Sequence, residues 1–128
     1  MNKNNSLKLI TAFPKLYKEN KVISCGDGWF QILWELSRKI EKEIERIEKQ
    51  LILADIEGQR LPFMTDVKEK YGTLRFYMSC ETETITEAIN AAEDLTKITC
   101  EICGQKGMIR EGRWIKVRCD QCEKSRGE

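Results

Sequence analysis

The sequence predicts an α+β fold in which a long helix and a second helix pack on a β-hairpin or small antiparallel sheet, followed by a C-terminal Cys₄ zinc ribbon. Three observations support this fold class. Apolar residues recur at helical spacing over residues 29–53 and 84–98, and they alternate with polar residues over 65–78. Two C-x-x-C pairs then follow. We expect residues 1–98 to form the α+β domain and 99–128 the zinc-ribbon module with a short charged tail.

The strongest signal is a set of four cysteines. They form two C-x-x-C pairs separated by fifteen residues: Cys100, Cys103, Cys119 and Cys122. Two such pairs close a tetrahedron around one zinc ion, and Gly104 supplies the positive φ that a metal knuckle needs. The intervening segment reads as two short strands, Gly107–Arg110 and Arg113–Arg118. Because the chain has no histidine and four thiolates leave no position for water, we expect a structural zinc ion and not a catalytic one.

The overall composition limits the classes of partner. The chain carries 22 basic and 21 acidic residues, a formal net charge of +1, so bulk charge does not indicate nucleic-acid binding and any anion site must come from local placement. No apolar run reaches membrane-spanning length, and the N-terminus lacks a hydrophobic signal core. We therefore expect a cytoplasmic protein with reduced cysteines. Two cysteines outside the quartet are expected to be small buried residues: Cys25 and Cys80.

The long helix is predicted from Trp29 to about Leu53. Its apolar residues recur at three- and four-residue steps: Trp29, Phe30, Leu33, Leu36, Ile40, Ile44, Ile47 and Leu51. The seam from Ile40 to Leu51 is narrow and the helix is long enough to outrun a small core, so a homodimer through it is one prediction and a solvated charged face the other. Trp34 lies off the seam, where we expect it to cover the zinc module or a partner.

The loop over residues 24–28 places Asp27 between two glycines, just before this helix. In the simpler interpretation Asp27 caps the helix and the glycines shape the turn. In the alternative interpretation the glycines let a ligand approach the backbone near Asp27, Gly28 and Trp29. The apolar residues over 7–17 precede this loop and are expected to dock on the core as an arm.

The hairpin around Tyr71-Gly72 has a predictable register. A two- or four-residue loop pairs Lys68 with Arg75, and alternation then divides the side chains between two faces. One face is apolar: Val67, Leu74, Phe76 and Met78. The other groups three cations and a tyrosine: Lys68, Lys70, Arg75 and Tyr77. This polar face is either the solvated side of a one-sided sheet or an anion site. In the anion site, Arg75 would form a bidentate hydrogen bond with a phosphate group, and Tyr77 or Tyr71 would stack on a base.

The second helix is expected to begin at a capping box formed by Thr84 and Glu87 and to run into Cys100. Its predicted apolar stripe is Ile85, Ala88, Ile89, Ala92, Leu95 and Ile98. In the ribbon that follows, basic strands with Arg113, Trp114 and Lys116 offer an alternative nucleic-acid surface.

Several motifs together resemble a known group of proteins. These are CGDGWF at 25–30, VKEKYG at 67–72, LRFY at 74–77 and CEICG at 100–104. Their order resembles a group of small proteins found in bacteriophages and bacterial genomes, over most of the chain. The resemblance implies that the 26–29 loop and the hairpin belong to one unit, and it transfers no catalytic residue. By analogy, small phage proteins often act by binding, including capture of nucleotide signals used in host defence.

The absence of a Ser/His/Asp set and of glycine-rich nucleotide motifs favours binding over catalysis. We expect a small phosphate-bearing ligand of nucleotide type. Its expected contacts are Asp27, Gly28, Trp29, Lys68, Lys70, Tyr71, Arg75 and Tyr77. One alternative is a protein–protein adaptor that uses the long helix or the ribbon, and the other is a nucleic-acid-binding zinc-ribbon protein.

Overall fold

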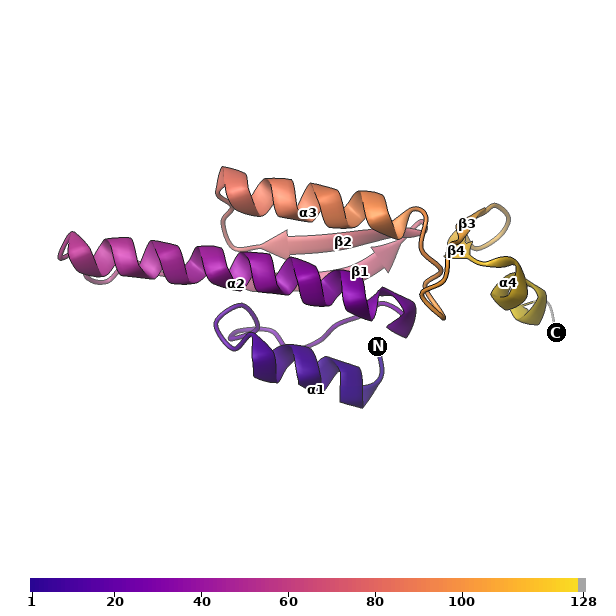
Figure 1. Cartoon of the computed structure of the whole chain (residues 1–128), viewed down its shortest axis with the longest axis horizontal. Helices are drawn as coiled ribbons and strands as arrows, with labels where there is room; N and C mark the ends of the chain where they lie inside the picture. Colours follow the sequence, from indigo (N-terminus) through magenta and orange to yellow (C-terminus); the bar gives the residue numbers. More distant parts are fainter. Residues whose placement is uncertain (127–128) are drawn as a thin grey trace.

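The computed structural model describes residues 1–126 and has the predicted α+β architecture. Its elements in chain order are α1 (Lys3–Ala12), a 3₁₀ turn (Asp27–Trp29), α2 (Phe30–Leu53), β1 (Met64–Lys70), β2 (Thr73–Met78), α3 (Glu83–Thr96), β3 (Met108–Arg110), β4 (Lys116–Arg118) and α4 (Asp120–Arg126). The antiparallel helices α2 and α3 lie over the β1–β2 hairpin, α1 lies beside α2, and β3, β4 and α4 form a small lobe at one end (Figure 1). Over residues 1–126, no helix combines the length and the apolar character needed to cross a membrane.

One apolar core joins the N-terminal arm, the long helices and the hairpin. Leu9, Leu16 and Tyr17 have no exposed surface, which confirms that the arm docks on the core. From the other elements, Ile40 and Val67 are equally buried. Burial of the apolar face of each amphipathic element is therefore what holds this layer of the molecule together.

The hairpin has the predicted register. Lys68 pairs with Arg75 across a two-residue loop, in which Tyr71 and Gly72 have φ of 54° and 79°, the conformation of a type I′ turn. Both strand edges are covered, since Ser24 exchanges hydrogen bonds with β1 and the Leu74 amide of β2 donates to Thr96 Oγ1 at 3.3 Å. The sheet therefore keeps one open face, the polar one.

The last turns of α2 extend beyond the body of the protein (Figure 1). Ile52 and Leu53 there are 71% and 78% exposed, because no helix or strand within residues 1–126 covers them. The prediction that the helix outruns its core is confirmed. Trp34, by contrast, does not cover the zinc-ribbon lobe: its ring packs against Phe13, with centroids 4.9 Å apart, and against Phe30.

Two predicted helix caps are wrong. The side chain of Asp27 does not cap α2 but accepts hydrogen bonds from the Asn2 amide at 2.8 Å and Asn5 Nδ2 at 3.1 Å, because the start of α1 brings these donors close. The second helix begins two residues before the expected box, at Thr82, whose hydroxyl accepts from the Ile85 amide and donates to Glu43 of α2. A contact between helices thus selects the cap.

Other predictions fail where the chain leaves the core. Leu95 and Ile98 are exposed, because α3 turns only Ile85, Ile89, Ala92 and Thr96 inward. Cys80 is exposed in the turn between β2 and α3, whereas Cys25 is buried as predicted. The expected charged tail, residues 123–128, is helical up to Arg126, and its last two residues lie outside the described part of the chain.

Candidate metal centre

The four cysteines of the two C-x-x-C pairs converge on one point. All four Sγ atoms lie within 4.8 Å of one another, and those of Cys103 and Cys119 are 3.6 Å apart. Tetrahedral coordination with metal–sulfur bonds of ~2.3 Å would place the sulfurs about 3.8 Å apart. The cluster therefore has the spacing and the donor atoms to hold a metal ion.

The surroundings of the cluster act differently on its thiols: the pKa of Cys100 is lowered, whereas the pKa values of Cys103 and Cys122 are raised. The backbone N–H groups that lower the pKa of Cys100 are those of Cys103, Cys119 and Ile102. Burial opposes ionisation of this thiol, but the three donors outweigh it and lower the pKa of Cys100 to about 6. The pKa of Cys122 is instead raised to about 12, first by its hydrogen bond with Cys119. Four thiolates at this spacing require a cation among them.

The loop at Gly26–Trp29 docks on the first cysteine knuckle. The Gly28 amide donates to the Glu101 carbonyl at 2.7 Å, the Gly26 amide to Glu101 Oε2 at 3.0 Å, and Trp29 Nε1 to the Thr99 carbonyl at 2.9 Å. A Cβ at Gly26 or Gly28 would overlap the backbone of residues 100–101. The glycines therefore admit a close backbone approach, and what approaches is the knuckle itself.

Glu101 is a site residue that the sequence does not reveal. It occupies a variable position of its C-x-x-C pair, yet its side chain is buried against the loop and burial raises its pKa. The sequence hint was the pair of glycines, Gly26 and Gly28, which indicated that another group approaches the loop backbone closely but did not identify that group.

A second contact joins the ribbon to the hairpin. Lys116 of β4 forms an ion pair with Glu69 of β1, and Glu69 also accepts from the Gly72 amide at 2.8 Å in the hairpin turn. Gly72 lies close to Val117, since a Cβ added there would come within 3.4 Å of its side chain. The hairpin tip and the 26–29 loop therefore hold the ribbon from two sides.

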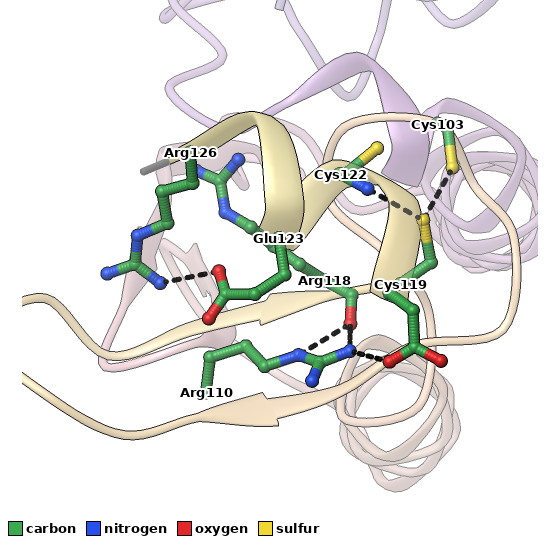
Figure 2. A network of polar contacts seen from close by, with 8 residues as sticks. Cys103, Arg110, Arg118, Cys119, Cys122, Glu123 and Arg126 are labelled. Carbon is green, nitrogen blue, oxygen red and sulfur yellow. Dashed lines mark hydrogen bonds and ion pairs between the residues drawn. The ribbon is translucent and has the colours of Figure 1, made fainter. Parts of the chain in front are cut away.

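The ribbon's strands are shorter than predicted, and three of its cations, Arg110, Lys116 and Arg126, form ion pairs. Arg110 donates to the Arg118 carbonyl and forms an ion pair with Asp120 at 2.8 Å, and Arg126 pairs with Glu123 at 3.3 Å (Figure 2). The predicted nucleic-acid surface is divided: Lys116 is paired with Glu69, while Arg113 and Trp114 remain exposed.

The eight residues predicted to bind a ligand fall into separate groups. Trp29 has no exposed surface, Gly28 is covered by the knuckle, and Asp27 binds the start of α1. The other five lie on the hairpin: Lys68, Lys70, Tyr71, Arg75 and Tyr77. The structure therefore does not bring the loop and the polar face of the hairpin into one site.

The polar face of the hairpin is partly neutralised. Lys68 pairs with Asp66 at 3.3 Å and lies 5.9 Å from the centre of the Tyr77 ring. Arg75 has a buried Nε with no hydrogen-bond partner among the described residues, and its charge faces Glu93 of α3, whose pKa is raised by burial and lowered in turn by Arg75. Within residues 1–126, Arg75 and Lys70 are thus the cations of this face that form no ion pair, whereas Lys68 is paired.

Comparison with known proteins adds no relative: the sequence matches no protein-family model, no curated protein and no solved structure. The fold and the cluster by themselves define the class, an α+β protein with a four-cysteine, ribbon-like C-terminal lobe.

Proposed function

We propose that this chain is a non-enzymatic binding protein built around one structural zinc ion. Cys100, Cys103, Cys119 and Cys122 would hold the ion. Zinc suits the site because it binds four thiolates tetrahedrally, neutralises their charge and cross-links the two knuckles. Four protein ligands leave no position for a reacting water, so a structural role follows from the donor set.

The proposed ligand is a small phosphate-bearing compound of nucleotide type, bound on the polar face of the hairpin. The observation that supports this is the grouping of Arg75 with Lys68, Lys70 and Tyr77 on one face of the hairpin, where Arg75 and Lys70 form no ion pair within residues 1–126. A guanidinium offers a planar fork to phosphate oxygens, while a tyrosine ring offers a stacking surface to a base. A nucleotide signal of host defence has both parts.

Native mass spectrometry of protein purified from cells, compared with the denatured sample, tests this proposal. We expect one zinc ion per chain and release of a small phosphate compound. Binding of that compound should be lost in Arg75→Glu and kept in Arg113→Glu, a matched reversal in the ribbon, with one zinc ion in both. Equal affinity of the two variants would contradict the hairpin site.

A protein partner is the second candidate, and the exposed end of α2 favours it. Ile52 and Leu53 are apolar and uncovered, so a homodimer through this helix would bury them. Sedimentation velocity should then show a dimer that dissociates in Leu53→Glu and persists in Arg75→Glu. Ile44 is unsuitable for this test, because it has no exposed surface and its replacement would damage the core.

A further inference from the structure

A solvent-facing groove runs between α2 and α3. Its volume is about 680 Å³, and it lies between the 38–46 segment of α2 and the 84–91 segment of α3. The groove exists because α3 presents Ala88 and Ala91 there, and these side chains are too short to fill the space between the helices. Most of the lining surface is apolar.

The apolar side of α3 continues past the groove. Leu95 and Ile98 follow Ala91 at four- and three-residue steps, and they are 50% and 56% exposed. The part of this strip that lies in α3, from Thr84 to Leu95, is about 17 Å long at ~1.5 Å per residue, and Ile98 follows just after the end of the helix. That length matches about three turns of a second helix lying along it.

The two walls of the groove differ in charge. The α2 wall carries Arg38, Lys42 and Arg46 at four-residue intervals, with Lys39 beside them. Arg38 is paired with Glu35 and Arg46 with the buried Glu43, whereas Lys39 and Lys42 form no ion pair within residues 1–126. The α3 wall contributes a single charge, that of Glu87. An occupant therefore meets an apolar floor with one strongly basic side.

We propose that this groove binds an amphipathic helix of a partner protein, with acidic residues on the flank that faces α2. Apolar side chains of that helix would enter over Ala88 and Ala91, in the helix-in-groove mode of recognition. Acidic residues three or four positions apart would lie beside Lys39 and Lys42, because that spacing repeats along one side of a helix. This site is separate from the polar face of the hairpin and does not depend on it.

Two synthetic 18-residue peptides test the proposal with the full zinc-loaded chain. Both carry leucines along one face of the helix, and the flank carries glutamate in one peptide and lysine in the other. By fluorescence anisotropy at low salt, we expect the glutamate peptide to bind at least about tenfold tighter than the lysine peptide. Its affinity should fall about fivefold in Lys42→Glu, fall further in Ala91→Arg, and stay unchanged in the matched reversal Lys3→Glu on α1.

Zinc content and circular dichroism show whether each variant is folded. The proposal is overturned if neither peptide binds, if the two peptides bind equally, or if Lys3→Glu weakens binding as much as Lys42→Glu. It is also overturned if the protein alone forms a dimer that Ala91→Arg dissociates, because the occupant would then be a second copy of this chain.

Discussion

The helical body and the ribbon of this protein are held together by different means. The body buries a continuous set of apolar side chains from α1, α2, α3 and the hairpin. After Thr99, the buried apolar residues within the described chain are Cys100 and Val117. Since so small an apolar cluster cannot support folding alone, we expect the ribbon to depend on the proposed metal and on its contacts with the body.

The junction between the two regions is made from backbone more than from side chains. Gly28 and Glu101 meet through main-chain atoms, and Gly26 donates to the Glu101 carboxylate. Such a junction tolerates no added atom at the glycines. We therefore expect three sources of stability: apolar burial in the body, the proposed metal in the ribbon, and close backbone contact between them.

Loss of the metal should have the largest effect. We expect removal of zinc by a chelator, or Cys103→Ser, to unfold residues 99–126 and to cost the ribbon about 10 kcal/mol, while the body stays folded. Cys80→Ser is the matched control, because Cys80 is exposed and outside the cluster. Amide NMR spectra would show this; collapse of body signals together with ribbon signals would mean that the body also needs the metal.

A cavity in the body should lower the stability of the body without loss of the metal. Ile40→Ala removes a fully buried side chain, so we expect a loss of about 2–5 kcal/mol in the free energy of unfolding, with zinc still bound. Leu53→Ala, on the uncovered end of α2, should change stability by less than about 0.5 kcal/mol. Chemical denaturation measures both, and equal losses would contradict the proposed limits of the core.

The junction is tested by Gly28→Ala. The added methyl group would overlap the Cys100 carbonyl, so the ribbon should separate from the loop and zinc affinity should fall about tenfold. Gly58→Ala is the control: it strains a φ of 78° but meets no neighbouring atom. Competition with a chelator reports the affinities. Identical zinc affinity in the two variants would show that docking does not support the metal site.

The contact between α2 and α3 should depend on pH. Arg46 donates to Glu43 and, together with the Thr82 hydroxyl, holds the pKa of Glu43 below its usual range despite burial. A lowered folded-state pKa stabilises the protein above the unfolded pKa, and this contribution is lost as pH falls through the folded value.

Glu43→Gln should therefore cost about 1 kcal/mol at pH 7, and the cost should shrink below about pH 4.5. The Cys103→Ser background removes the effect of acid on the metal. Glu35→Gln is the control, since its pairing with Arg38 is exposed. A cost that is constant down to pH 3 would contradict the assignment.

The smallest effect is expected at the hairpin turn. Tyr71 has a positive φ, which asparagine adopts more readily than tyrosine. Tyr71→Asn should raise stability by about 0.5 kcal/mol in thermal unfolding, with Tyr77→Asn as a control that leaves the turn unchanged. A decrease in the Tyr71 variant would show that its ring, 5.5 Å from Lys70 Nζ, contributes more than the strain costs.

Sequence periodicity was a reliable guide where burial of one apolar face fixes the structure of an element. Alternation predicted the hairpin register and its two faces, and three- and four-residue steps predicted α2 nearly to its ends. It was less reliable for α3, where a hydrogen bond to Glu43 of α2 selects Thr82 as the cap. A local sequence pattern does not include a hydrogen-bond partner on another helix, so the predicted N-cap of α3 was two residues too late.

The cysteine spacing predicted the cluster, because each C-x-x-C turn brings two thiols together, and the pairing of β3 with β4 then brings the two turns to one point. The amphipathic periods likewise predicted most of the core side chains of α2 and the hairpin, but not the exposure of Leu95 and Ile98. Only the tertiary structure decided that the 26–29 loop packs on the cysteine knuckle, that Trp29 is closed to any ligand, and that a basic-walled groove opens between α2 and α3. These depend on how elements distant in sequence cross in space, and short-range periodicity carries no information about those crossings.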